Sequence, residues 1–336
     1  MMKAAWTSPS NIALVKYWGK RGNQLPQNAS ISFTLKNAVT ELSISAQKLA
    51  SQNKLSLDFW FESSPNLKFK EKIEKFLITQ TARFPWLLNH HLEIHSSNTF
   101  PHSSGIASSA SSMSALNLCL LSLDELYRDK KYEQKEFFSL ASELSRLGSG
   151  SASRSVYGGI VSWGNVSENY ATPFSDAHAV FNNYCDSILI VDEGTKSVSS
   201  RAGHGLMENH PFKDERYKIA SANFTKIAHA LKSGNIESFI EVVEEEALML
   251  HAMMMTSRPS YILLKPQSLL LIEKIRAYRT EKSIPVCFTI DAGPNIHLLY
   301  PKSHETLVRK WIDEELAVKC IHDEMGSGPI NIEARK

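Results

Sequence analysis

The spacing of apolar residues predicts both strands and helices in the first half of the chain. Alternating apolar and polar residues predict strands at 40–46 and 55–62, and residues 92–95 have an extended character. Apolar residues at helical spacing predict helices at 70–81, 107–124 and 133–147, and an apolar run predicts a strand at 160–163. This half of the chain is therefore expected to combine a sheet with paired helices.

A second series of predicted elements begins near Cys185. The apolar run 187–191 predicts a buried strand, and a polar loop follows it to about residue 213. Beyond that loop the spacing predicts helices over 215–281, strands at 285–290 and 296–300, a helix at 303–316 and a strand at 317–322. Strands and helix pairs are mixed without regular strand–helix–strand alternation, which favours an α+β fold. The length of the chain and this second series of elements together predict two domains, residues 1–186 and 187–336.

Composition and charge limit the classes to which the chain can belong. Its 336 residues are 43% hydrophobic, and 37 Lys and Arg against 35 Asp and Glu give a formal charge of +2. No nucleic acid and no membrane surface is therefore expected as a partner. Four cysteines occur singly, which is typical of buried thiols in a reducing compartment. Because neither a signal peptide nor a run of about 18 apolar residues is evident, we expect a cytoplasmic protein.

The densest cluster of small polar residues lies at 101–112, directly before a helical pattern. A loop that opens into a helix presents unpaired backbone N–H groups and the positive end of the helix dipole, which together bind phosphate. Ser108 and Ser109 add hydroxyls for phosphate oxygens or magnesium. An ordinary capped helix beside a serine-rich loop explains the segment equally well. The chain has no P-loop, GxGxxG, GxSxG or HExxH motif, so the common nucleotide-binding, hydrolase and zinc-protease signatures are absent.

Three further segments combine hydroxyls or glycines with cations. Residues 11–21 place three cations around a Tyr-Trp-Gly turn at the end of an apolar strand, an arrangement suited to a polyanion. Residues 148–154 read Gly-Ser-Gly-Ser-Ala-Ser-Arg, and residues 196–201 read Lys-Ser-Val-Ser-Ser-Arg. Each segment alone also fits a solvated loop or strand end. Together with residues 101–112 they predict a phosphate-rich ligand.

One carboxylate, Asp291, ends the apolar strand Val-Cys-Phe-Thr-Ile and opens the turn Asp-Ala-Gly-Pro-Asn. Asp and Asn serve such turns by hydrogen-bonding their own backbone. A carboxylate at the end of a buried strand is also well placed to meet a hydroxyl that accepts a phosphoryl group. The residues alone therefore favour a phosphotransferase without identifying its substrate. His90, His91 and His95 are interpreted as ordinary strand or surface histidines and not as a metal site.

These segments, in this order, resemble the mevalonate diphosphate decarboxylases. That family belongs to the GHMP kinase superfamily of galactokinase, homoserine kinase, mevalonate kinase and phosphomevalonate kinase. The similarity extends over nearly the whole chain, and its most specific part is Lys-Tyr-Trp-Gly-Lys-Arg at 16–21. Kinases of the superfamily carry a Gly-Glu-His type sequence there. The resemblance also covers residues 104–110, 148–159, 199–201 and 291–295.

The resemblance implies a two-domain GHMP-kinase-like fold. Its N-terminal, ATP-binding domain would be similar to the second domain of ribosomal protein S5, and its C-terminal domain would be ferredoxin-like. The implied substrate is mevalonate 5-diphosphate, with ATP and Mg²⁺ as cofactors. Phosphorylation of the tertiary 3-hydroxyl, followed by loss of that phosphate with carbon dioxide, would give isopentenyl diphosphate. Because phosphate leaves readily from a tertiary carbon, no electron-sink cofactor is expected. A homodimer is also expected, since family members are commonly homodimers.

The resemblance further implies roles for individual residues. The expected catalytic residues are Asp291 beside the accepting hydroxyl, Arg154 at the substrate carboxylate, and Lys16 and Lys196 near the transferring phosphate. The residues expected to bind the substrate are Tyr17, Lys20, Ser149, Ser151, Arg154, Ser200 and Arg201. The residues expected to bind ATP are Asn11, Ser104, Gly105, Ala107, Ser108 and Ser109, and Ser108 is also the candidate magnesium ligand.

The resemblance is incomplete at three places. The loop Pro-His-Ser-Ser-Gly-Ile-Ala-Ser-Ser replaces the family's usual Pro-Thr-Ala-Ala-Gly-Leu-Ala-Ser-Ser, and residues 326–329 read Gly-Ser-Gly-Pro where relatives often have Gly-Pro-Gly-Pro. Arg201 is followed by Ala-Gly-His where many relatives have Gly-Met. A GHMP-family kinase or decarboxylase that acts on mevalonate or its monophosphate therefore stays open as the alternative. A catalytically silent binding protein is a third reading, but it would not need both Asp291 and Arg154.

Overall fold

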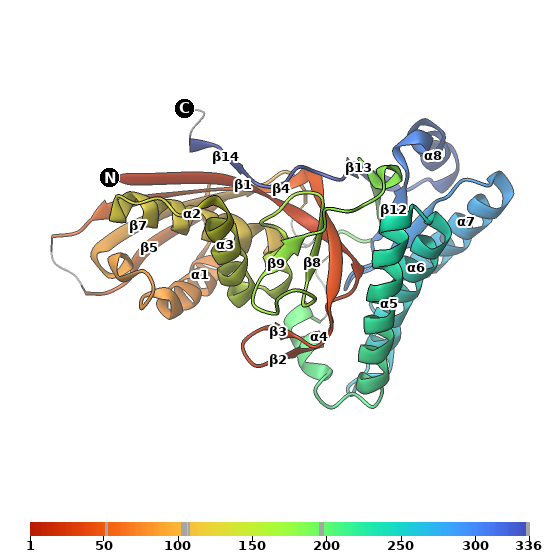
Figure 1. The fold of residues 1–336 in the computed structure, drawn as a ribbon, viewed down its shortest axis with the longest axis horizontal. Helices are drawn as coiled ribbons and strands as arrows, with labels where there is room; N and C mark the ends of the chain where they lie inside the picture. The colour runs from red at the N-terminus through yellow and green to blue at the C-terminus, as the bar shows by residue number, and fades with distance from the viewer. Residues whose placement is uncertain (51–52, 102–105, 107, 195–197, 334–336) are drawn as a thin grey trace.

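The structure is a computed structural model that describes residues 1–50, 53–101, 106, 108–194 and 198–333. Its strands form two main sheets and one short two-stranded ribbon. In Figure 1 the larger sheet and the helices of the first half of the chain lie at one end of the molecule, and the helices of the second half lie at the other. The mixture of sheets and helix pairs confirms the predicted α+β class.

The larger sheet is built almost entirely from the first half of the chain. Its strands are β1 (Met2–Val15), β4 (Ser30–Lys48), β5 (Ser56–Phe61), β6 (Ser64–Pro65), β7 (His90–Asn98), β8 (Ile160–Trp163), β9 (Ala171–Pro173) and β14 (Ile330–Asn331). Their order is β14-β1-β4-β7-β5-β6; outside this order, β8 pairs with β4 and β9 pairs with β8. The pairs are antiparallel except that of β5 with β7. Because β14 pairs with β1, the end of the chain returns to this sheet.

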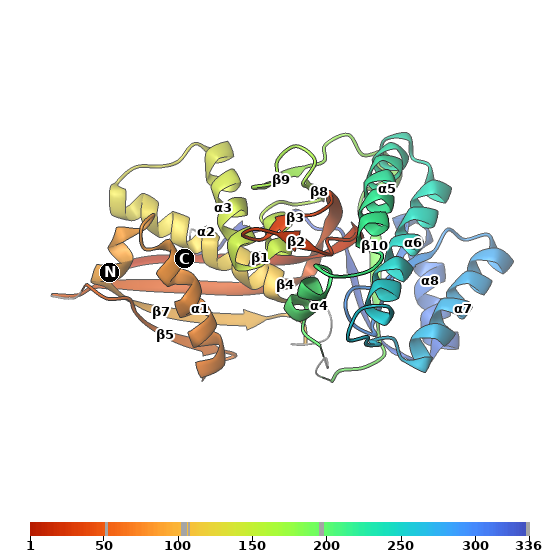
Figure 2. The same ribbon diagram turned by 90° about the horizontal axis from the view of Figure 1, so that it is seen from below.

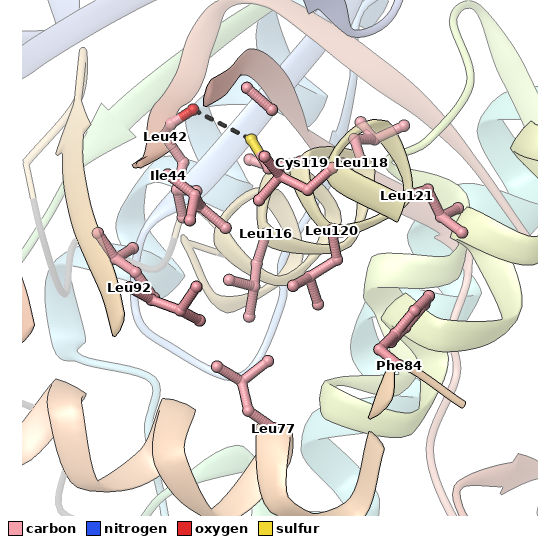
Figure 3. Close-up of a cluster of buried hydrophobic side chains, with 14 of the residues drawn as sticks. Leu42, Ile44, Leu77, Phe84, Leu92, Leu116, Leu118, Cys119, Leu120 and Leu121 are labelled. Carbon is pink, nitrogen blue, oxygen red and sulfur yellow. Dashed lines mark hydrogen bonds between the residues drawn. The ribbon is translucent and has the colours of Figure 1, made fainter. Parts of the chain in front are cut away.

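Three helices cover one side of the larger sheet (Figures 1 and 2). They are α1 (Leu67–Gln80), α2 (Ser108–Arg128) and α3 (Gln134–Gly148). Leu42 and Ile44 of β4 belong to one buried cluster with Leu116 and Leu120 of α2 (Figure 3). The Cys119 thiol donates to the Leu42 carbonyl oxygen at 3.4 Å. Each such leucine, removed from water, stabilises the fold by about 1.5–3 kcal/mol.

The second sheet consists of β10 (Cys185–Ile190), β11 (Cys287–Thr289), β12 (Ile296–Tyr300) and β13 (Lys319–Glu324). Its order is β11-β12-β10-β13, and all its pairs are antiparallel. Its helices are α5 (Lys213–Ser233), α6 (Ile236–Met255), α7 (Pro266–Lys282) and α8 (Glu305–Trp311). Gly234 ends α5 with a φ of 76°, and the Asn235 side chain caps α6 by accepting from the Ser238 N–H. Within the described residues, no helix is both long enough and apolar enough to cross a membrane.

Most predicted elements are confirmed, and one region was predicted wrongly. The expected polar loop between 191 and 213 contains a short helix, α4 (Ser200–Leu206). The Ser199 side chain starts this helix by accepting from the Ala202 N–H. The sequence Ser-Arg-Ala-Gly-His-Gly-Leu gives no apolar periodicity, so the pattern could not predict it. The strand expected at 40–46 is part of the much longer β4, whose first six residues are all buried and therefore do not alternate.

Candidate active site

A cavity of about 1290 Å³ brings together the segments that sequence analysis singled out. In Figure 2, α4 and the ribbon of β2 (Lys20–Arg21) and β3 (Leu25–Pro26) lie mid-molecule, between α1–α3 on one side and α5–α8 on the other. The predicted site residues that line the cavity are Asn11, Lys16, Tyr17, Lys20, Ser108, Ser109, Ser149, Ser151, Arg154, Ser200, Arg201 and Asp291. The predicted residues Ser104, Gly105, Ala107 and Lys196 lie outside the described part of the chain.

The centre of the site is an ion pair between Lys16, which directly follows β1, and Asp291, in the turn after β11. Lys16 Nζ lies 2.7 Å from Asp291 Oδ1. The lysine side chain is 2% exposed, whereas the aspartate side chain is 26% exposed and borders the cavity. Burial lowers the pKa of Lys16, and the charge of Asp291 opposes that shift. The pair thus places a carboxylate at the cavity, with the buried amino group of Lys16 against it.

A buried network holds the backbone of Lys16 in place. Its N–H donates to Glu246 Oε2 at 2.9 Å, and its carbonyl oxygen accepts from the Asn28 side chain at 3.0 Å. Arg216 binds both oxygens of Glu246 at 2.7 Å, and Asn223 donates to Oε1 at 3.0 Å. The Arg216 and Glu246 side chains are 0% exposed. The network links α5 and α6 to the end of β1, so the position of Lys16 depends on both helices.

Arg154 lies at the end of a short 3₁₀ turn (Gly150–Arg154) and is almost fully buried. Nε donates to Ser32 at 2.9 Å and Nη1 to Ser30 at 2.6 Å, while Nε and Nη2 approach the Asn11 side-chain oxygen at 3.3 Å. Burial lowers the pKa of Arg154 to about 10, so the group keeps its charge at neutral pH. A guanidinium has five N–H groups, and these bonds leave one on each Nη for a bidentate ligand.

The Tyr17 ring is fixed between two other rings, with centroids 4.8 Å from Trp163 and 4.5 Å from His204. Its hydroxyl is buried and has no hydrogen-bond partner among the described residues. Burial raises the pKa of Tyr17 above its ordinary value, so the phenol stays a donor. The Tyr17 side chain lies close to the backbone of Gly150. Only a glycine fits there, because a Cβ at this position would lie 2.7 Å from the Tyr17 hydroxyl oxygen. The arrangement leaves an unpaired polar group on a residue that lines the cavity.

Hydroxyl groups and cations surround this centre. Ser108 and Ser109 begin α2 at the cavity, and Ser109 Oγ lies 3.3 Å from Ser149 Oγ. On the α4 side, burial and the nearby charge of Arg201 lower the pKa of Lys20. Two cations are therefore close together there, and they favour an anionic ligand between them. Within the described residues, no group of three or more His, Cys, Asp or Glu is placed to hold a metal ion.

Sequence reasoning missed two parts of this site. The cavity continues along α1, where Lys68, Lys72 and Phe76 form a wall that no motif had indicated. The Glu246 network was also missed. A usable signal was present, because Arg216 and Asn223 are seven residues apart and share one face of a helix whose other members there are apolar. A charge on a buried helix face predicts a buried partner, but not which one.

Comparison with known proteins gives the family. A sequence model described as "Diphosphomevalonate decarboxylase-like N-terminal domain" matches residues 8–173, and another, "Mevalonate 5-diphosphate decarboxylase C-terminal domain", matches residues 187–333. A diphosphomevalonate decarboxylase from Debaryomyces hansenii is 30% identical over 322 residues, covering 90% of this chain and 80% of the relative. The chain belongs to the diphosphomevalonate decarboxylase family. The resemblance stated from the motifs is confirmed.

Solved structures of this family have the same fold over nearly the whole length. Mevalonate diphosphate decarboxylase from Staphylococcus aureus is 28% identical, with a TM-score of 0.85 and 98% of each chain covered. A structure of MDDEF in complex with MVAPP, AMPPCP and magnesium is 26% identical, again with a TM-score of 0.85 and 98% of each chain covered. The predicted two-domain GHMP-kinase-like fold is confirmed by these likenesses. The chain is accordingly an ATP-dependent decarboxylase of this family.

Proposed function

We propose that this protein converts mevalonate 5-diphosphate and ATP into isopentenyl diphosphate, ADP, phosphate and carbon dioxide, a step of the mevalonate pathway of isoprenoid biosynthesis. The observation that carries the proposal is the single cavity in which Asp291, Arg154 and the start of α2 meet. A phosphoryl acceptor, a carboxylate and a nucleotide phosphate each have a complementary group there. The related MDDEF binds MVAPP, AMPPCP and magnesium together, which supports the same set of ligands for this chain.

In the first step Asp291 orients the tertiary hydroxyl of the substrate. The carboxylate accepts the hydroxyl hydrogen bond and takes the proton as the oxygen bonds to the γ-phosphorus of ATP, and ADP leaves with the electrons of the broken P–O bond. Lys16, 2.7 Å from Asp291, stabilises the carboxylate in its ionised form before the reaction. We assign to Lys16 a second role, neutralising charge that develops on the phosphoryl oxygens.

In the second step Arg154 holds the substrate carboxylate. The two N–H groups that its protein partners leave unused match the two oxygens of a carboxylate. The bond to the carboxyl carbon breaks, its electrons form the new carbon–carbon double bond, and the phosphate leaves with the electrons of its C–O bond. Carbon dioxide is released. A guanidinium held from three sides keeps the breaking bond in one orientation, which lowers the entropy cost of this step.

We assign ATP and Mg²⁺ to the α2 end of the cavity. The hydroxyls of Ser108 and Ser109 and the start of a 21-residue helix supply donors for phosphate. A magnesium ion keeps several waters and takes phosphate oxygens, so it needs few protein ligands, and the Ser108 hydroxyl fits that need. The ATP roles of Ser104, Gly105 and Ala107, and the role of Lys196, stay predictions from the sequence.

Asn11 receives a different role from the one that the resemblance implied. Its amide nitrogen donates to the Ser151 carbonyl oxygen at 3.2 Å and to Ser155 Oγ at 2.8 Å, and its oxygen accepts from Arg154. Since both ends of the amide are engaged within the protein, we propose that Asn11 positions Arg154 and does not bind ATP. The residues proposed to bind the substrate are unchanged: Tyr17, Lys20, Ser149, Ser151, Arg154, Ser200 and Arg201.

We also propose the domain division, the location and the oligomeric state of the protein. We retain the division into residues 1–186 and 187–336, supported by the two family matches, which end at residue 173 and begin at residue 187. The second sheet begins at the same place along the chain, with β10 at Cys185. A cytoplasmic location is supported by the four cysteines, which are free thiols. The homodimer stays a prediction from the family resemblance.

The decisive test is an assay of the purified protein with ATP, Mg²⁺ and, separately, mevalonate, its 5-phosphate and its 5-diphosphate. We expect ADP and carbon dioxide in equal amounts, and only with the diphosphate. ADP without carbon dioxide would identify a kinase that stops at the phosphorylated product. Turnover of mevalonate or its monophosphate in preference to the diphosphate would establish the alternative substrate. If no ADP is formed with any of the three substrates, the interpretation as a catalytically silent binding protein would be the one that stands.

Replacement of Arg201 tests the diphosphate end of the site. We expect Arg201→Ala to raise the KM for mevalonate 5-diphosphate by at least about tenfold, with a smaller change in kcat, because a charge-assisted contact is lost. Lys282→Ala is the matched control, since it removes one positive charge from the exposed end of α7, outside the cavity. Initial rates over a range of substrate concentrations provide the measurement. A loss confined to kcat would place the Arg201 charge elsewhere in the reaction.

A further inference from the structure

His204 lies in the cavity, and the chemistry described above does not use it. Its ring packs between those of Tyr17 and Trp18, with centroids 4.5 and 4.6 Å away. The preceding residue, Gly203, allows this contact, because a Cβ there would lie 2.6 Å from Trp18 ring atoms. The helix α4, which begins with Ser200 and Arg201, is thus pressed against the loop after β1 at His204.

A hydrogen bond defines which ring nitrogen carries the proton. The backbone N–H of Gly19 donates to His204 Nδ1 at 3.1 Å, so Nδ1 is an acceptor and the proton of the neutral ring is on Nε2. Burial, with a smaller contribution from Lys20, lowers the pKa of His204 to about 3, so the ring is neutral near pH 7. Nε2 has no hydrogen bond to another described residue, although the ring borders the cavity. The ring therefore offers one N–H donor of known position.

The surroundings of this donor indicate what it binds. The charge of Lys20 acts on the His204 ring, and the charge of Arg201 acts on Lys20, so the two cations and the ring form one cluster. Lys20, Arg201 and His204 all line the same cavity, so an anion held there by the cations can also meet the Nε2–H group. A neutral donor adds a hydrogen bond without adding to the repulsion between the cations. The ligand that fits all three groups has several anionic oxygens, as a diphosphate does.

We propose that His204 is a substrate-positioning residue whose Nε2–H donates to an oxygen of the substrate diphosphate; this deepens, and rests on, the proposed function. Through its Nδ1 bond to Gly19 and its contact with Tyr17, His204 also connects α4 to the Lys16–Gly19 segment. Binding of the diphosphate at α4 is thereby coupled to the position of the residues that face the reacting hydroxyl. His204 acts on orientation and takes no part in proton transfer.

Two substitutions of His204 by amide residues distinguish the contribution of Nε2 from that of Nδ1. His204→Gln places an amide nitrogen near the position of Nε2, whereas His204→Asn places an amide oxygen near Nδ1 and leaves nothing at Nε2. Titration calorimetry without ATP measures the affinity of each variant for mevalonate 5-diphosphate and for inorganic pyrophosphate. We expect His204→Gln to stay within about threefold of the wild type and His204→Asn to lose at least about tenfold for both ligands. The affinity for ADP serves as the control and is expected to stay unchanged. In steady-state assays His204→Asn raises KM more than it lowers kcat.

The outcomes are distinct from those that test the function itself. Equal affinities of His204→Asn and the wild type overturn the proposal, and so does a His204→Gln variant as weak as His204→Asn, since ring packing would then explain the loss. A wild type that binds pyrophosphate but not mevalonate 5-diphosphate contradicts the proposed function, and the pyrophosphate series then decides on His204. A wild type that binds neither ligand overturns both.

Discussion

Asp291→Ala is expected to lower kcat by about a thousandfold or more while leaving the affinity for ATP nearly intact. The carboxylate borders the cavity. In the mechanism proposed above, its removal takes away both the orienting group and the proton acceptor. Asp291→Asn should lower kcat to a similar extent, because it keeps the size of the side chain and loses the charge. Single-turnover measurement of ADP and carbon dioxide, together with nucleotide titration, provides the test.

The control for this variant is Asp176→Ala. Asp176 pairs with Lys232 at 3.3 Å in an exposed ion pair outside the cavity, so its loss should change neither kcat nor KM. Thermal melting of Asp291→Ala shows whether Lys16, left buried without its partner, has destabilised the fold. A turnover number equal to that of the wild type in either Asp291 variant would refute the assignment of this carboxylate.

Glu246→Ala is expected to lower the free energy of unfolding by about 3–5 kcal/mol, because it leaves the Arg216 charge buried without a partner. The two side chains are fully inaccessible, and Arg216 makes both of its 2.7 Å contacts with this one carboxylate. The backbone N–H of Lys16 also loses its acceptor. Activity should therefore fall together with stability. Denaturant unfolding and steady-state rates measure the two effects.

Two comparisons separate these effects. Glu241→Ala breaks the exposed pair with Lys226, which also joins α6 to α5, and should cost less than about 1 kcal/mol. The double variant Glu246→Leu with Arg216→Met removes both buried charges and should recover much of the lost stability. It should not recover full activity, because Lys16 still lacks its acceptor. Equal destabilisation by Glu246→Ala and Glu241→Ala would contradict the buried network described above.

Much of the site could be predicted because its residues stand in contiguous, unusual segments. A turn rich in cations, a serine-rich loop before a helix, and an aspartate at the end of a buried strand each suggest a ligand within a few residues of sequence. The role of each individual residue within these segments could not be predicted in this way. The resemblance implies an ATP role for Asn11, whereas its contacts with Arg154, Ser151 and Ser155 show that its amide is used within the protein.

The sequence alone determined the composition of the fold, the family motifs and the chemistry of the segments, because apolar periodicity and residue type are local properties. Only the tertiary structure decided which charges neutralise each other. Lys16 and Asp291 are 275 residues apart, and Lys16 and Glu246 are 230 apart, yet each pair is in direct contact. It also decided the tautomer of His204, which depends on a backbone N–H 185 residues away. Such pairings follow from the packing of α4, α5, α6 and the turn after β11 against the end of β1, and no local pattern encodes that packing.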